Sequence, residues 1–222
     1  MISPKFSLTH YSYNAKTLSS LNSTTAPHIV NLYLDYNCPF SAKLYLKFKS
    51  SVVPELNKKH PGLFQFVFVN VVQPWHLNSI FLNEYSIVFA KILREKGIDN
   101  SNELFWNVSE VLFANKESFY DTFNVSLNRN EIYQQINDLV FDKLSIPFDK
   151  KEVLKGLTID SNESNPNNEG NDATADIKYF TKYLRGVGVH VTPTVSVDGI
   201  ANGNISSGSE PEELIKILES SL

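Results

Sequence analysis

The sequence predicts an α/β fold in which a parallel half and an antiparallel half share one β-sheet, with a helical block inserted between them. Three observations support this prediction. Residues 28–72 have the hydrophobic pattern of a strand, a helix and a strand. Residues 173–222 have the pattern of a helix, two strands and a helix. From residue 78 to residue 144, apolar residues recur at spacings of three and four, which indicates helices.

The first unit begins with HIVNLYLDY (28–36), whose β-branched and aromatic residues alternate as in a buried strand. Pro39 then stands in the first turn of a helix, where its missing N–H leaves no hydrogen bond unmade. Apolar residues continue at helical spacing, and Pro54 is expected to kink or end this helix. LFQFVFVNVV (63–72) is apolar on both faces, as a central parallel strand should be. The unit is therefore expected to be βαβ, with Cys38 at the end of its first strand.

The inserted helical block is predicted over residues 77–157, and its apolar stripes are expected to pack as core. The third stripe begins at Asn128, with Glu131 three residues later in the pattern of a capping box. The polar, Asn-rich residues 158–172 follow, and they are expected to form a mobile loop because they contain no apolar anchor.

The C-terminal unit, residues 173–222, begins with a helix that is expected to stop near Gly186. Two short strands then flank Asp-Gly at 198–199, a dipeptide typical of a hairpin turn. The last helix is expected to have Ser209 as its N-cap and Pro211 in its first turn.

Composition argues against several classes of protein. With 222 residues, 42% of them hydrophobic, the chain is long enough for a packed core without disulfides. Its single cysteine excludes an intramolecular disulfide and agrees with a reducing compartment. The net charge of −4, without a basic cluster, argues against nucleic acid as a partner. No apolar run approaches the roughly 20 residues of a membrane span, so no membrane partner is expected.

Residues 1–27 are polar with scattered aromatics, and one stretch in them is compatible with an edge strand. They lack the apolar core of a secretory signal and the arginines of a mitochondrial presequence. A cytoplasmic protein is therefore expected, with the nucleus as the alternative.

Cys38, the lone cysteine, stands where the first strand turns into a helix, and Ser41 stands three residues later. Unpaired N–H groups and the positive end of the helix dipole at such a position stabilise a thiolate over a thiol. The hydroxyl of Ser41, one helical turn on, is expected to donate to the sulfur, but it cannot attack a mixed disulfide. Release of a substrate bound to Cys38 would then need an external thiol, for which glutathione is the candidate. The alternative is that Cys38 is a small buried hydrophobic residue.

Cys-Pro at a strand–helix junction (38–39), with Thr-Pro before a hairpin far downstream (192–193), resembles the thioredoxin fold. The long helical insertion makes the chain similar to the disulfide-oxidoreductase A (DsbA) branch, which includes the kappa-class glutathione transferases. DYNCPFSAK (35–43) is similar to a Cys-Pro-Phe-Ser variant of little-characterised eukaryotic thioredoxin-like proteins. The resemblance covers residues 28–222 and implies a thioredoxin fold with a helical domain between the βαβ and ββα halves.

The resemblance also implies roles for individual residues. Cys38 matches the nucleophilic cysteine, and Pro193 matches the cis-proline that packs opposite it. The backbone of Thr192 would then contact a substrate chain or the cysteinyl part of glutathione. The residues expected to bind substrate or glutathione are Pro39, Phe40, Thr192 and Pro193. Ser41 replaces the resolving cysteine, which argues against dithiol oxidase or isomerase activity.

Four further residues are candidates for this site. Trp75 and His76 follow the second strand, where packing at a helix start is the favoured interpretation and lining a pocket is the alternative. His190 precedes the Thr-Pro pair and is a candidate to approach the cysteine, unless it is only a hydrogen-bonded histidine at a strand end. Asp35 ends the first strand and is a candidate buried acid, capping residue or proton-transfer group.

Three functional hypotheses follow. The first is a monothiol thiol–disulfide oxidoreductase that acts through Cys38, with glutathione or a protein mixed disulfide as its partner. The second is a non-catalytic module that binds an extended peptide along the edge at 192–193. The third is glutathione transfer to an electrophile, as in kappa-class transferases, where a serine occupies the cysteine's position. With one cysteine and scattered histidines, neither a metal site nor a bound cofactor is expected.

Overall fold

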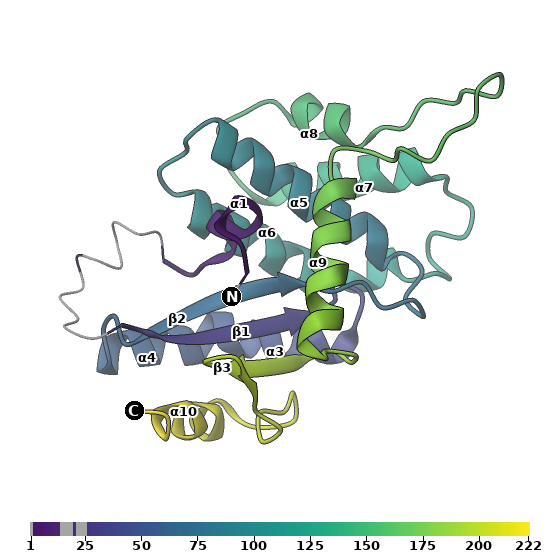
Figure 1. Cartoon of the computed structure of the whole chain (residues 1–222). Helices are drawn as coiled ribbons and strands as arrows, with labels where there is room; N and C mark the ends of the chain where they lie inside the picture. Colours follow the sequence, from purple (N-terminus) through teal and green to yellow (C-terminus); the bar gives the residue numbers. More distant parts are fainter. Residues whose placement is uncertain (1, 14–19, 21–25) are drawn as a thin grey trace.

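The computed structural model describes residues 2–13, 20 and 26–222 (Figure 1). Four strands form one sheet in the order β2-β1-β3-β4. The strands are β1 (His28–Leu34), β2 (Phe64–Asn70), β3 (Thr194–Val197) and β4 (Ile200–Ala201). β1 pairs with β2 in parallel and with β3 antiparallel, and β3 pairs with β4 in a hairpin. The prediction that a parallel and an antiparallel half share one sheet is therefore confirmed.

The helical segment after β1 runs in three pieces. α3 (Pro39–Lys47) and α4 (Val53–Lys59) are joined by the π-helical segment η2 (Phe48–Val52). Pro54 has no N–H to donate to the carbonyl four residues before it. The regular α-helical hydrogen bonding is therefore interrupted in the turn before this proline. The irregularity expected at Pro54 therefore takes the form of a π-helical turn.

Helices cover both faces of the sheet. α3 and α4 lie behind the strands in Figure 1, and α10 (Pro211–Glu219) packs against η2. α9 (Thr174–Val187) crosses the opposite face in front of β1 and β2. Helices thus lie on both faces of the sheet. The first turn of α3 lies at the carboxyl end of β1. Within the described residues, none of the helices is both long and apolar enough to cross a membrane.

The insertion between β2 and α9 is helical, as predicted. Its helices are α5 (Ser79–Glu95), α6 (Ser101–Ala114), η3 (Lys116–Phe119), α7 (Arg129–Lys143) and α8 (Lys150–Leu157). The capping box of Asn128 and Glu131 at the start of α7 is confirmed, and a second one, Asp149 with Glu152, starts α8. The chain between α8 and α9 has no helix or strand and extends away from the body of the molecule (Figure 1).

The insertion and the sheet share one aromatic core. Phe68 of β2 is fully buried, and its ring lies 5.1 Å from that of Tyr36, which follows β1. The same ring lies 5.9 Å from Tyr45 of α3 and 5.6 Å from Phe105 of α6. Because one side chain contacts both parts, the helical block is packed onto the thioredoxin-like half rather than loosely attached to it.

The edge strand considered for residues 1–27 is not present in residues 2–13, and residues 14–19 and 21–25 lie outside the described part of the chain. α1 (Pro4–Ser7) and η1 (Leu8–His10) are helical, and only Tyr11 forms a single antiparallel bridge, with Val67. Buried polar groups hold this segment, since Asn102 of α6 donates to the carbonyls of Leu8 and Tyr11 at 2.7 and 2.9 Å. Side-chain contacts of this kind leave no alternating pattern in a sequence.

Two helix ends differ from their predicted positions. The N-cap of α10 is Glu210 and not Ser209, because Pro211 occupies the first helical position and fixes the residue before it as the cap. α9 continues past Gly186 and ends at Gly188, whose φ of +70° provides the left-handed C-cap.

Candidate active site

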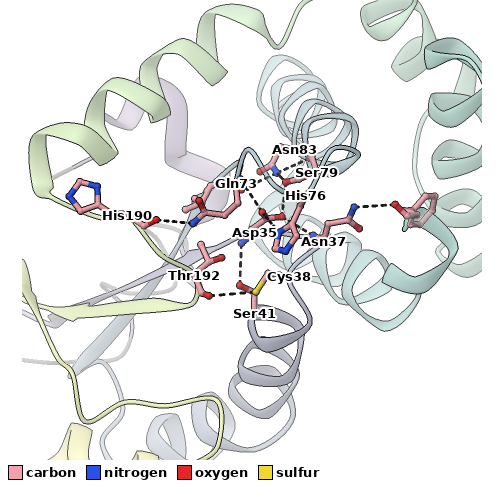
Figure 2. Close-up of polar contacts among 12 residues, drawn as sticks. Asp35, Asn37, Cys38, Ser41, Gln73, His76, Ser79, Asn83, His190 and Thr192 are labelled. Atoms are coloured by element: carbon pink, nitrogen blue, oxygen red, sulfur yellow. Dashed lines mark hydrogen bonds and ion pairs between the residues drawn. The ribbon is translucent and has the colours of Figure 1, made fainter. Parts of the chain in front are cut away.

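Cys38 is the N-cap residue of α3, at the carboxyl end of β1. Its N–H donates to the Asp35 carbonyl at 3.1 Å, and its own carbonyl accepts from Ala42 at 3.0 Å. Its Sγ donates to the carbonyl of Thr192 at 3.5 Å (Figure 2). The peptide bond between Thr192 and Pro193 is cis. Residues more than 150 positions apart in the chain therefore meet at one end of the sheet.

The thiol is almost fully buried, as in the alternative interpretation of Cys38 as a small buried hydrophobic residue. Cys38 is only 4% exposed, whereas Phe40, two residues later, is 61% exposed. Ser41 is fully buried, and its Oγ accepts from the backbone N–H of Asp35 at 3.3 Å. The described residues contain no Ser41–Cys38 hydrogen bond, because the sulfur is directed to the Thr192 carbonyl instead. Instead of the expected contact with the sulfur, the Ser41 hydroxyl accepts a hydrogen bond from the Asp35 N–H. This bond links the first turn of α3 to the residue that follows β1.

Asp35 is fully buried, and its carboxylate accepts four hydrogen bonds. Oδ1 accepts from the N–H of Asn37 at 2.8 Å and from Oγ of Ser79 at 2.6 Å. Oδ2 accepts from the N–H of Gln73 at 3.0 Å and from Nδ1 of His76 at 2.9 Å (Figure 2). A buried carboxylate is stable only when its oxygens are satisfied in this way. Of the roles considered for Asp35, the structure supports that of a buried acid.

Two of these four donors come from the connection between β2 and α5, and a third, Ser79, is the first residue of α5. The connection is itself turned by backbone bonds, from His76 N–H to the Gln73 carbonyl at 3.1 Å and from Ser79 N–H to the His76 carbonyl at 2.9 Å. Gln73 also donates through Nε2 to the His190 carbonyl at 3.2 Å. The connection thus wraps around Asp35 and links the end of β1 to the segment that carries the Thr-Pro pair.

His76 lines a pocket of about 280 Å³ beside Cys38. The other lining residues are Asn37, Pro39, Tyr120 and Asp121. Asn37 and Pro39 are the two chain neighbours of Cys38, which is not itself one of the lining residues. Burial raises the pKa of Tyr120, and the negative charges of Glu117 and of Cys38 raise it further. The Tyr120 hydroxyl therefore stays protonated and can donate to a group bound in this pocket.

The remaining candidates divide into two groups. Trp75 is 59% exposed, with its ring edge-on to that of His76 at 6.1 Å, so it borders the site on its solvent side. His190 contributes only its backbone carbonyl, and Figure 2 shows its imidazole directed away from Cys38. Of the two interpretations of His190, the approach to the cysteine is therefore not what the structure shows, because the side chain at this exposed position turns outward.

Three residues of the site were not identified from the sequence: Asn37, Ser79 and Tyr120. Ser79 is the first residue of α5, so a serine near a helix start was visible, but its carboxylate acceptor was not. Tyr120 follows η3 in the inserted block, and no spacing rule connects that position to Cys38.

No protein-family model matches the chain, and no curated protein matches its sequence. Solved structures do match its fold. A Pseudomonas syringae protein provisionally described as a protein-disulfide isomerase matches with a TM-score of 0.64 at 20% identity, over 87% of this chain and 94% of its own. BdbD from Bacillus subtilis, in its oxidised form, matches with a TM-score of 0.58 at 19% identity, over 99% and 94%. DsbA from Chlamydia trachomatis matches with a TM-score of 0.57 at 14% identity, over 90% of both chains.

At these identities the similarities establish the fold. They extend over the helical insertion as well as the sheet, since they cover at least 87% of this chain. The chain therefore has a DsbA-like thioredoxin fold, with a helical domain inserted between its βαβ and ββα halves.

Proposed function

We propose that this protein is a monothiol thiol–disulfide oxidoreductase that acts through Cys38, with glutathione as its co-reductant. One observation is the main support: Cys38 Sγ lies at the N-terminus of α3, 3.5 Å from the carbonyl that precedes the cis bond to Pro193. In general the positive end of a helix dipole favours a negatively charged sulfur, and here the thiol donates its hydrogen to the Thr192 carbonyl. The fold that this chain shares with proteins named DsbA and protein-disulfide isomerase agrees with such chemistry.

The reaction would proceed in two exchanges. The Cys38 thiolate attacks a mixed disulfide between a substrate and glutathione, forms a disulfide with the glutathionyl sulfur, and releases the substrate as a thiolate that takes up a proton. The thiolate of a second glutathione then attacks the glutathionyl sulfur, so that oxidised glutathione leaves and the Cys38 thiolate returns. Ser41 has no sulfur to form a second disulfide, so an external thiol is required for every turnover.

A protein-borne mixed disulfide suits the surface around the site. Phe40, Trp75 and Val191 are 61%, 59% and 61% exposed, and each adjoins a residue of the site in the chain. Exposed apolar side chains around a polar centre are typical of a surface that contacts another polypeptide. The co-reductant would be small enough for the pocket beside Cys38, whose polar lining includes Asn37 and Tyr120.

The test is to mix the reduced protein with a glutathionylated peptide and analyse the intact protein by mass spectrometry. Because Cys38 is the only cysteine, a gain of one glutathionyl group must be on it. We expect this adduct, its removal by added glutathione, and complete loss of peptide reduction in Cys38→Ser. A Ser41→Cys variant serves as the matched comparison, since its second thiol should release glutathione from Cys38 without an external thiol.

A second candidate, a non-catalytic module that binds an extended peptide, is favoured by the 4% exposure of Cys38. The two functions differ in the reactivity of the thiol. An alkylation rate for Cys38 no faster than that of an ordinary thiol at neutral pH, with no adduct and with peptide binding retained in Cys38→Ala, would replace the first proposal by the second. A Cys38→Ser variant that still conjugated glutathione to an electrophile would instead identify a transferase.

A further inference from the structure

We propose that the imidazole of His76, oriented by Asp35, is the acid–base group for thiol exchange at Cys38. This inference rests on the proposed function, because it assigns the proton transfers that the two exchanges require. It goes beyond that function because it makes the rate depend on a residue that makes no covalent bond.

The hydrogen bonds of Asp35 determine which nitrogen of His76 is free. Oδ2 of Asp35 accepts from the backbone N–H of Gln73 and contacts Nδ1 of His76 at 2.9 Å, while Oδ1 accepts from Asn37 and Ser79. A carboxylate surrounded by four donors acts only as an acceptor, so Nδ1 carries the hydrogen. In the neutral imidazole Nε2 therefore has a lone pair and can accept a proton. A proton gained there would be stabilised by the buried negative charge of Asp35.

The pocket gives His76 access to the reacting groups. The His76 side chain is 22% exposed, and it lines the same pocket as Asn37 and Pro39, the neighbours of Cys38. Asn37 is 3% exposed, and its buried Oδ1 has no hydrogen-bond partner in the described part of the chain. A thiol that enters this pocket would meet the His76 imidazole next to the two chain neighbours of Cys38.

The other titratable groups around this pocket are few. Asp35 contacts the imidazole directly, and Tyr120 and Asp121 share the pocket lining. Glu117 of η3 acts on Tyr120, as does Cys38. Among the described residues, Lys116 also lies here and pairs with Glu117 at 3.7 Å. The carboxylate of Asp35 is the charged group that contacts the imidazole directly.

A purely structural role for His76 is the alternative. The residue is one of three donors by which the β2–α5 connection is anchored to Asp35, and Gln73 and Ser79 have no other chemistry to offer there. His76 differs from these two because an imidazole can both accept and donate a proton, and because this one lies in a pocket. An anchor would affect stability at every pH, whereas an acid–base group affects the rate only where the attacking thiol is protonated.

Over one turnover, as many protons are taken up as are released. In the first exchange the substrate sulfur leaves as a thiolate and takes a proton from Nε2 of protonated His76. In the second exchange the neutral imidazole takes the proton of the incoming glutathione thiol, whose thiolate attacks the glutathionyl sulfur on Cys38. The substrate thus gains the proton that glutathione loses, and both His76 and Cys38 return to their starting states.

His76→Asn is the informative variant, because the Nδ2 amide of asparagine can replace Nδ1 as a donor to Asp35 while the base is lost. Reduction of a glutathionylated peptide by glutathione would be followed from pH 6 to pH 9. We expect the rate to fall about 100-fold at pH 7, and to approach the wild-type rate at pH 9, where glutathione itself supplies thiolate. His190→Asn is the matched control, since that imidazole is directed away from Cys38, and its pH profile should equal the wild type (Figure 2).

A second measurement uses the wild-type protein alone, in case His76→Asn does not fold. An aromatic thiol that is already ionised at neutral pH needs no base, so the enzyme should accelerate its reaction far less than that of glutathione, each relative to the uncatalysed exchange. Equal acceleration of both thiols, or a His76→Asn loss that is the same at all pH values, would overturn this inference and leave the proposed function intact. Activity that survives in Cys38→Ser would instead overturn the proposed function.

Discussion

His10 and His76 are both held by the oxygen of a neighbouring side chain, but the two oxygens differ in charge. Nε2 of His10 lies 2.9 Å from Oδ1 of Asn70, and Nδ1 of His76 lies 2.9 Å from Oδ2 of Asp35. A proton added to His76 would complete an ion pair with a carboxylate. A proton added to His10 would place an uncompensated cation against an amide.

The surroundings increase this difference. His10 is 1% exposed, and its ring lies 4.1 Å from that of Phe105. Burial lowers the pKa of His10 to about 3, the positive charge of Arg94 contributes to this, and the bond to Asn70 opposes it only in part. His76 is partly exposed in a pocket beside the cysteine. Burial with a hydrogen bond therefore does not by itself make a proton-transfer group; a compensating charge and access to the reacting atoms are needed as well.

The largest effect that separates the two regions should come from Phe105→Ala. This ring is fully buried against His10 and Phe68, so its removal leaves a cavity in the aromatic core. We expect the free energy of unfolding in urea to fall by about 4 kcal/mol. The exchange rate per folded molecule should be unchanged, because the ring does not line the pocket beside Cys38; a specific loss of exchange would show that the two regions are coupled.

The next effect is a pH dependence of stability due to His10. Between its folded pKa of about 3 and its ordinary value of 6.5, the unfolded chain binds a proton that the folded chain does not, so stability is lost as the pH falls through this window. From pH 7 to pH 4 this amounts to about 3 kcal/mol.

The measurement compares urea unfolding of the wild type and His10→Gln at both pH values. Glutamine does not titrate, so the stability advantage of the wild type at pH 7 should shrink by this amount at pH 4. The carboxylates that also titrate in this range are common to both proteins and cancel in the difference. A constant difference between the two proteins would mean that His10 is protonated in the folded state.

The two histidines also differ in how well the sequence predicted their surroundings. His76 was considered as a pocket residue, besides packing at a helix start, because it follows a recognisable buried strand at the sheet edge where the first strand–helix junction also lies. His10 belongs to a polar segment without periodicity, and its burial depends on Asn70, Asn102 and Trp106, which lie far away in the chain. The strands, the Cys-Pro junction and the hairpin were predictable because local pattern and turn chemistry determine them.

The four hydrogen bonds of Asp35 could not be predicted in the same way. Ser79 and His76 reach the carboxylate only because the β2–α5 connection turns back toward the end of β1, and the packing of the inserted block decides that path. The burial of Cys38 was one of two alternatives, and the sequence could not decide between them for a related reason. A helix N-terminus is visible in a sequence, but the approach of the Thr192 carbonyl to its sulfur is not.

Asp35→Asn should have a smaller effect on stability and a specific effect on exchange. The amide keeps one acceptor oxygen, and the Ser79 hydroxyl can rotate to accept from the new NH₂ group, so one buried N–H is left unpaired. We expect a loss of about 2 kcal/mol. The orientation of His76 should also weaken, so exchange with glutathione should slow more at pH 7 than at pH 9. A loss of stability with an unchanged pH profile would restrict Asp35 to a structural role.

The smallest change in stability is expected for Trp75→Ala, which tests the solvent-exposed surface next to His76. Trp75 is 59% exposed and meets His76 only at the ring edge, so the free energy of unfolding should change by no more than about 0.5 kcal/mol. Loss of an aromatic contact to a polypeptide substrate should nevertheless raise KM for a glutathionylated peptide about fivefold. The KM for a glutathione disulfide without a peptide should stay the same.

Leu8→Ala is the matched control for this variant, because Leu8 is 57% exposed on η1, outside the site. Neither KM should change in that variant. If Trp75→Ala left the peptide KM unaltered, the apolar surface around Cys38 would not be where the substrate chain binds. The specificity of the site would then have to come from the pocket next to His76 alone.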